Sequence, residues 1–326
     1  MLKKKNKEFT ALIGTGYWGT NIARNLLKLC KKKLYIFDNN IENMNILVKK
    51  FPNKFIIINE YKHLLENQTI KNFIFATPPS QNFKLVSEAL TYKKKIFLEK
   101  PGFKNYIEIQ QIKKKFPREI KNIYFGYIYM FNNYIKYIKK FINNKKNGKV
   151  IYVKCQRQNL GPIRNDVDVN YDLSTHDLSI LLFLFGNRIK VISNLRHNIL
   201  KKNIADISNL SLRIKDFLTD INNSWLNPDK IRRITIITNK KMLLFDEMKQ
   251  FKKIKIYNQY AEYPKIKKLS KINFFKNAKI YEGSSIEPKI KENDPLYDEL
   301  KYFLDSDKKK NIINYRFASI ILKLIL

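Results

Sequence analysis

The hydrophobic positions in the first third of the chain alternate between two patterns. Short apolar runs, typical of buried parallel strands, are separated by stretches in which apolar residues recur every three or four positions, as in amphipathic helices. Strands are expected at Phe9–Ile13, Leu34–Phe37, Phe55–Ile58, Phe73–Ala76, Ile96–Leu98 and Ile123–Phe125. Strands and helices that alternate in this way predict an α/β domain with a doubly wound parallel sheet, the Rossmann arrangement.

The pattern changes near residue 122. An amphipathic stretch at Tyr134–Phe141 precedes a strand at 150–156, and a helix is expected at about 173–185. Polar and apolar residues then alternate in several runs between 190 and 256, which is typical of half-buried antiparallel strands. We therefore predict two domains: a Rossmann domain at 1–122, and an α+β domain with an open, mostly antiparallel sheet at 123–326.

Three glycines lie between the first expected strand and the helix that follows it. Gly14, Gly16 and Gly19 form a GxGxxG motif in a chain that has only nine glycines. In this context the first glycine permits a tight turn, the second lets a pyrophosphate approach the main chain, and the third lets helix and strand pack closely. The motif predicts a dinucleotide site at the helix N-terminus.

A carboxylate follows the second expected strand. Asp38 lies where an acidic side chain binds the ribose hydroxyls of NAD and repels the additional phosphate of NADP. The sequence therefore predicts NAD as the cofactor. The alternative is a glycine-rich turn beside a surface aspartate.

Two further groups lie at expected strand ends or helix starts. Lys100 directly follows a buried strand, in Glu99-Lys100-Pro101, although a surface lysine before a helix would have the same pattern. Asp172 and His176 are four residues apart on one predicted helix, so that the carboxylate could orient the imidazole as a general base. Alternatively, Asp172 caps the helix and His176 packs beneath it.

The charge of the chain favours anionic ligands. A net charge of +36 over 326 residues suggests nucleic-acid binding. However, the lysine clusters are scattered along a chain that is also rich in Asn, Ile, Phe and Tyr, which indicates compositional bias. We expect a solvated basic surface and no nucleic-acid partner.

The remaining composition indicates a cytoplasmic protein. Cys30 and Cys155 are far apart and lack metal-ligand spacing, so no metal site is expected. The apolar run behind the basic N-terminal residues is too short for a signal peptide, and no run is long enough to span a membrane.

Taken together, these motifs resemble those of the glucose-fructose oxidoreductase and inositol dehydrogenase (Gfo/Idh/MocA) family. The matching segments are Gly14-Thr-Gly-Tyr-Trp-Gly19, Ala76-Thr-Pro-Pro79, Glu99-Lys-Pro101, Asp172-x3-His176 and Phe185-Gly186. The resemblance implies that Lys100, Asp172 and His176 are catalytic, with Lys100 and His176 flanking the reacting sugar carbon. The NAD contacts are then expected from Gly14, Gly16, Tyr17, Trp18, Gly19, Asp38, Asn39, Ala76, Thr77, Pro78, Glu99 and Lys100.

Finer motifs are similar to one subgroup of that family. Segments 157–164, 171–180, 224–230 and 294–296 resemble enzymes that oxidise the 3-hydroxyl of UDP-N-acetylglucosamine or its uronate for surface-polysaccharide sugars. The expected substrate contacts are Lys100, Arg157, Asn159, Arg164, Asp172 and His176. Arg157 and Arg164 are candidates for the diphosphate or the uronate, and surface charge is the alternative for both.

The chain also departs from this subgroup. Residues 126–131 lack the usual histidine and arginine after the glycine, and Tyr171 replaces a tryptophan. Family members are usually dimers or tetramers, so the resemblance implies a homo-oligomer. Two other functions remain open: an inositol or free-sugar dehydrogenase or sugar ketoreductase of the same family, and a non-catalytic NAD-binding protein with a nucleic-acid-binding surface.

Overall fold

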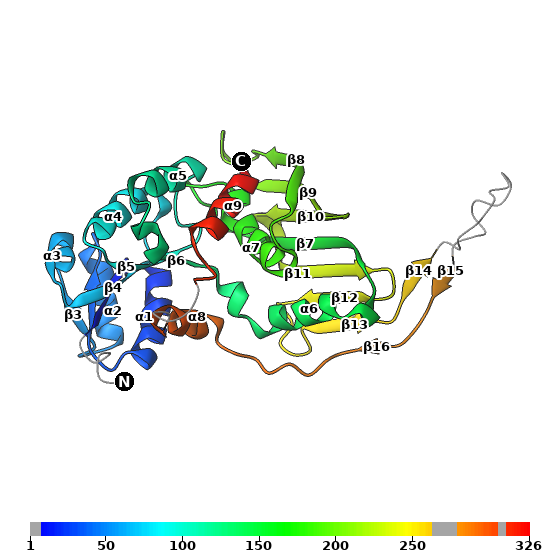
Figure 1. Cartoon of the computed structure of the whole chain (residues 1–326), viewed down its shortest axis with the longest axis horizontal. Helices are drawn as coiled ribbons and strands as arrows, with labels where there is room; N and C mark the ends of the chain where they lie inside the picture. Colours follow the sequence, from blue (N-terminus) through cyan, green and yellow to red (C-terminus); the bar gives the residue numbers. More distant parts are fainter. Residues whose placement is uncertain (1–7, 263–278, 306–310) are drawn as a thin grey trace. The chain divides into compact units, whose positions relative to one another are not determined.

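The computed structural model describes residues 8–262, 279–305 and 311–326 (Figure 1). The chain folds as two compact units. The first extends to Phe131 and also includes Asp294–Leu324, and the second comprises Asn132–Asn293. The sequence predicted a single boundary at 122/123, whereas the chain returns to the first unit near its C-terminus. Aromatic packing explains this return, since the Phe303 ring lies 5.6 Å from that of Phe97 and 5.3 Å from that of Tyr124.

A six-stranded parallel sheet forms the centre of the first unit. Its strands are β1 (Phe9–Ile13), β2 (Leu34–Phe37), β3 (Phe55–Ile57), β4 (Ile70–Phe75), β5 (Lys95–Glu99) and β6 (Ile123–Gly126). They are arranged in the order β3-β2-β1-β4-β5-β6, all parallel. The strand order reverses between β1 and β4, which is where open α/β sheets bind ligands at the carboxyl ends of their strands. The predicted Rossmann sheet is confirmed.

Helices connect these strands and close the unit. They are α1 (Tyr17–Leu29), α2 (Ile41–Lys50), α3 (Tyr61–Glu66), α4 (Pro79–Thr91), α5 (Tyr106–Lys115), α8 (Pro295–Asp305) and α9 (Tyr315–Ile325), with 3₁₀ turns at Glu119–Asn122 and Ile128–Phe131. The short helix α3 and the terminal helix α9 were not predicted. Asn314 caps α9 by accepting hydrogen bonds from the main-chain N–H groups of Arg316 and Phe317.

An eight-stranded sheet forms the centre of the second unit. Its strands are β7 (Val150–Leu160), β8 (Ile189–His197), β9 (Ile207–Ile214), β10 (Phe217–Ser224), β11 (Leu226–Thr238), β12 (Met242–Asp246), β13 (Ile254–Tyr257) and β16 (Ser285–Ile286). They are arranged in the order β16-β13-β12-β11-β7-β10-β9-β8. The β7–β10 pair is parallel and the other neighbours are antiparallel. The prediction of an open, mostly antiparallel sheet is confirmed.

Two helices, two short helical turns and a small ribbon accompany this sheet in the described residues. Helix α6 (Asn133–Asn143), a 3₁₀ turn at Lys145–Asn147 and helix α7 (Thr175–Phe185) belong to the unit, and a π turn at Asn170–Ser174 leads directly into α7. Strands β14 (Tyr260–Glu262) and β15 (Lys279–Tyr281) pair separately. Among the described helices of the chain, none has the length and apolar character that a membrane span requires.

Candidate active site

The three glycines between β1 and α1 have different surroundings. Gly14 has φ +90°, and a Cβ there would lie 2.6 Å from the Ala76 carbonyl oxygen. A Cβ at Gly19 would collide with the Gly14 carbonyl oxygen, whereas no described atom beyond the chain neighbours lies within 4 Å of the Cβ position of Gly16. The loop therefore turns tightly at Gly14, packs closely at Gly19 and stays open at Gly16, as a main chain that receives a pyrophosphate requires.

The N-terminus of α1 is open to an anion. No described side chain caps it, and its first turn contains no acidic residue. The main-chain N–H groups and the positive end of the helix dipole can therefore interact with phosphate. Tyr17 and Trp18, in the same turn, are 86% and 38% exposed.

Asp38 is held against the glycine loop. Its carboxylate accepts hydrogen bonds from the main-chain N–H groups of Thr15 (2.7 Å) and Asn40 (2.9 Å), and from the Thr15 hydroxyl (3.0 Å). These bonds fix a half-buried negative charge beside the loop, while Asn39 is exposed. Sequence reasoning missed Thr15, which is buried and joins the two elements.

A buried asparagine connects the loops after β4 and β5. The Asn82 side chain accepts a hydrogen bond from the Thr77 hydroxyl (2.5 Å) and donates one to the Gly102 carbonyl (2.6 Å). It therefore joins the predicted Ala76–Pro78 and Glu99–Pro101 segments within the first unit. Asn82 was also missed, although a polar residue on the buried face of α4 is a readable signal.

Glu99 and the half-buried Lys100 stand at the carboxyl end of β5. The Glu99 carboxylate accepts a hydrogen bond from the Lys100 main-chain N–H (3.2 Å) and another from the Trp18 side chain. Burial raises the pKa of Glu99 to about 7. Glu299 of α8 is fully buried, and burial together with the charge of Glu99 raises its pKa well above the usual range.

Asp172 and His176 occupy different kinds of helical turn. Asp172 lies in the π turn, and His176 is the second residue of α7. The single helix expected from the sequence is therefore a π turn followed by an α-helix. Residues four apart lie on the same side in both kinds of turn, so the shared face of Asp172 and His176 stays a prediction. Asp172 is not the cap residue of the alternative interpretation, since Ser174 occupies the N-cap position of α7. The side chain of His176 is half-buried, while Thr175 and Asp177 on either side are buried.

Arg164 forms ion pairs within the second unit. Its guanidinium lies 2.6 Å from the Asp166 carboxylate and 3.6 Å from that of Asp172, with about a third of its side chain (34%) exposed. The hydrogen bond with Asp166 raises the pKa of Arg164 and lowers that of Asp166. Arg164 thus couples the polar loop after β7 to the π turn.

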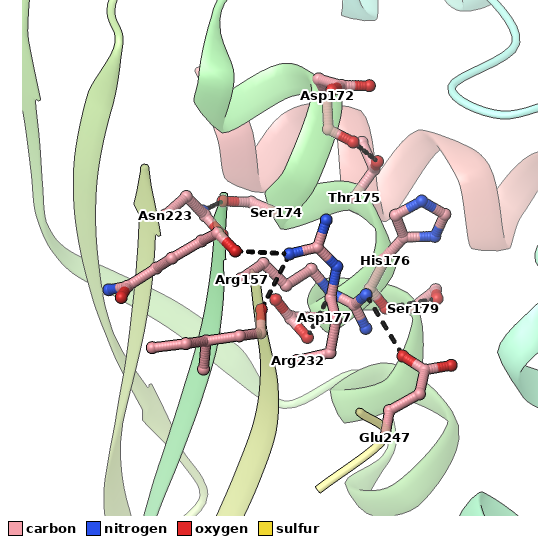
Figure 2. A network of polar contacts seen from close by, with 12 residues as sticks. Arg157, Asp172, Ser174, Thr175, His176, Asp177, Ser179, Asn223, Arg232 and Glu247 are labelled. Atoms are coloured by element: carbon pink, nitrogen blue, oxygen red, sulfur yellow. Dashed lines mark hydrogen bonds and ion pairs between the residues drawn. The ribbon is translucent and has the colours of Figure 1, made fainter. Parts of the chain in front are cut away.

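Arg157 is an internal residue. Alternation along β7 places its side chain on the buried face with Val153, Cys155 and Asn159. Its Nε lies 2.9 Å from the Asp177 carboxylate, and both side chains are at most 5% exposed (Figure 2). This arrangement contradicts the surface-charge interpretation. It does not support Arg157 as a phosphate ligand, because the guanidinium is buried and held by Asp177.

The Asn159 side chain also forms hydrogen bonds within the protein. Its amide oxygen accepts a hydrogen bond from Arg232, and its amide nitrogen donates one to the Gly161 carbonyl. Gly161 lies at the start of the polar loop that contains Arg164, and Arg232 comes from β11. Asn159 thus shapes the start of that loop.

The described part of the chain contains no group of three or more His, Cys, Asp or Glu residues arranged to hold a metal ion. Cys30 and Cys155 are free thiols. Burial raises the pKa of both, so neither favours the thiolate that metals bind.

The first unit also has a recognisable sequence signature. Residues 10–127 match the model of an oxidoreductase family with an NAD-binding Rossmann fold, Gfo/Idh/MocA. This part of the chain belongs to that family. The protein is therefore an NAD-binding oxidoreductase, and the open glycine loop fits a bound dinucleotide.

Solved structures resemble the whole chain. UDP-N-acetylglucosamine 3-dehydrogenase GnnA from Acidithiobacillus ferrooxidans is 17% identical with a TM-score of 0.75, and the match covers 97% of this chain and 94% of that one. Myo-inositol dehydrogenase from Corynebacterium glutamicum is 19% identical with a TM-score of 0.75, covering 98% and 94%. GenD2 from gentamicin A biosynthesis, in complex with NAD, is 13% identical with a TM-score of 0.78, covering 98% and 92%. At these identities the likeness shows the fold. No curated protein matches the chain.

Proposed function

We propose that the protein oxidises a secondary hydroxyl, that of C3, on a UDP-N-acetyl sugar or its uronate. The chemistry that NAD supplies when bound is acceptance of a hydride. His176 takes the hydroxyl proton at an imidazole nitrogen, and Lys100 donates a hydrogen bond to the same oxygen as it becomes a carbonyl. Asp172 orients the sugar or the imidazole.

The half-buried imidazole of His176 supports its role as the base. Figure 2 shows Asp177 directed toward Arg157, whereas the His176 ring is directed away from that pair. His176 therefore adjoins the buried Arg157–Asp177 pair in the sequence, while its ring points to another side of α7. This placement is what a proton acceptor for a bound sugar needs.

One observation carries the substrate class. Arg164 keeps about a third of its side chain (34%) exposed although it pairs with Asp166 and Asp172. A nucleotide diphosphate is a strong ligand for such a guanidinium, and the net charge of +36 would raise its encounter rate. The similarity to a UDP-N-acetylglucosamine 3-dehydrogenase favours the same substrate.

A second candidate is oxidation of inositol or a free sugar, or reduction of a keto-sugar. The equally similar myo-inositol dehydrogenase favours it. We further propose a cytoplasmic homo-oligomer that serves surface-polysaccharide synthesis and binds neither nucleic acid nor membrane. The resemblance of the motifs to the family supports the homo-oligomer and the role in polysaccharide synthesis. The scattered lysine clusters and the two isolated cysteines support the other proposals.

Absorbance of NADH after mixing NAD-loaded protein with each sugar tests the substrate. We expect reduction with UDP-N-acetylglucosamine or its uronate, and little with myo-inositol or glucose. Rapid reduction by inositol and none by any UDP-sugar would select the second candidate.

Arg164→Ala tests the contact that defines the substrate class. It should weaken binding of the sugar nucleotide at least about tenfold without changing the affinity for NAD, because a charge-assisted bond is lost. Arg196→Ala is the matched control, since Arg196 is equally exposed (34%) and pairs with Asp168 at 3.4 Å. Equal effects of both variants on sugar-nucleotide binding would count against Arg164.

A further inference from the structure

Two buried polar contacts flank His176 along the chain. One residue after it, Asp177 accepts a hydrogen bond from Arg157 Nε at 2.9 Å. Two residues before it, the Ser174 hydroxyl accepts one from the Asn223 amide at 2.5 Å. Figure 2 shows these residues together beneath the turn that leads into α7.

Both contacts originate from one place in the sheet. Arg157 of β7 and Asn223 of β10 are register partners in the parallel pair of this sheet. Their side chains lie on the buried face, where Arg157 is 4% and Asn223 is 1% exposed. Two adjacent positions on neighbouring strands therefore hold the chain on either side of His176.

The Ser174 contact continues through the π turn. The Ser174 hydroxyl donates to the Asn170 amide oxygen at 2.5 Å, and the Asn170 amide nitrogen donates to Asn194 at 3.2 Å. Asn170 and Ser174 are the first and last residues of the turn that carries Asp172. The same polar chain thus fixes both ends of that turn.

General stability does not explain a buried ion pair here. Removing two charges from water offsets most of their attraction, and apolar residues of similar size usually stabilise a core as well or better. A buried ion pair does fix direction, since each partner has a single productive geometry. What the two contacts provide is a defined orientation for the start of α7.

We propose that Arg157–Asp177 and Asn223–Ser174 are positioning pairs that set the direction of the His176 imidazole. The inference rests on the proposed function of His176 as the base. It reassigns Arg157 from a substrate ligand to a residue that acts through α7. It also predicts that the pairs affect turnover without affecting the affinity for NAD, because they lie in the second unit.

The test replaces the ion pair as a whole. Arg157→Met/Asp177→Leu removes both charges of the buried pair, and Glu247, which lies 4.0 Å from Arg157, is partly exposed to water (30%). The melting temperature should therefore stay within a few degrees of the wild type. We expect kcat to fall about tenfold or more and KM for NAD to stay unchanged. Arg233→Met/Asp246→Leu is the control on the same sheet, because that pair at 2.8 Å bridges β11 and β12.

A second readout does not depend on turnover. Diethyl pyrocarbonate acylates accessible imidazoles, and mass spectrometry separates His176 from His63 and His197, which are both exposed. In the double variant we expect the acylation rate of His176 to change at least about threefold, while the other two rates stay constant. If the wild type oxidised no sugar, the proposed function would fail, but this rate would still report on the positioning pairs.

Ser174→Ala provides an independent variant should the double variant fold poorly, because it removes only one hydroxyl. We expect a several-fold lower kcat and a changed His176 acylation rate. Wild-type kcat and a wild-type acylation rate in a folded variant of either pair would overturn the proposal for that pair.

Discussion

The predicted site residues of the two units reach their positions in different ways. In the first unit, the loop at Gly14–Gly19 is shaped by the main chain and by the absence of side chains. In the second unit, Asp172 and His176 depend on side chains that come from β7 and β10. The first arrangement therefore depends mainly on local residues, and a side chain added at a glycine disrupts it. The second depends on residues that are distant in the sequence, and removal of their polar groups disrupts it.

His176→Gln should give the largest functional effect in this comparison. Glutamine fills a similar volume but cannot accept the proton, so turnover should fall about 10²–10⁴-fold. NAD affinity and the thermal melt should stay nearly unchanged, because His176 is half-buried and lies in the second unit. Steady-state kinetics, cofactor titration and calorimetry check this.

Lys100→Met is the counterpart in the first unit and should lower turnover in a similar way.

One outcome would contradict the role of His176. A His176→Gln protein that unfolds, with normal activity per folded molecule, would show that His176 is a core residue and not the base.

Gly19→Ala and Gly16→Ala form a matched pair within the cofactor loop. A Cβ at Gly19 meets the Gly14 carbonyl, so that variant should lose about 3 kcal/mol of stability and its NAD binding. Gly16 has open space around it, so Gly16→Ala should fold normally and lose only cofactor affinity. Thermal melts with and without NAD distinguish the two effects. Equal melting temperatures would contradict the local encoding of this loop.

The same difference explains what could be predicted from the sequence. The strands of the first unit follow from short apolar runs, and the three glycines lie where the motif places them. Helix α3 is too short for periodicity to show. Helix α9 was overlooked although Ala318, Leu322 and Ile325 have helical spacing.

In the second unit, local patterns were less informative. The π turn at Asn170–Ser174 has no local sequence signal, because Asn223 and Asn194 hold it from other strands. The parallel pairing of β7 with β10 is likewise non-local. The burial of Arg157 could have been predicted, since it shares one face of the strand with Val153 and Cys155, but its charge suggested a surface position.

Cofactor choice tests whether Asp38 adds specificity to the glycine loop. Its carboxylate, fixed by two main-chain N–H groups, would face the 2′-phosphate of NADP. We expect NAD to bind at least about tenfold more tightly than NADP, roughly 1.4 kcal/mol. Asp38→Ser should reduce this ratio. Fluorescence titration with both cofactors decides, and equal or tighter binding of NADP by the wild type would exclude this role.

Replacing the buried Glu299 should have the smallest effect of these variants, a change in how the stability of the first unit depends on pH. Its pKa is raised in the folded protein, so between the unfolded value near 4.5 and the folded value it keeps a proton that the unfolded chain releases. Stability should therefore fall as the pH rises through this range. Glu299→Gln removes that ionisation and should raise stability at pH 8 by on the order of 1 kcal/mol, with little change at pH 4.

Glu292→Gln is the control, because a hydrogen bond from Lys253 lowers the pKa of that carboxyl and gives it the opposite pH dependence. Denaturant unfolding at several pH values measures the effect, and parallel curves for the wild type and Glu299→Gln would mean that Glu299 is ionised at no cost in the folded protein.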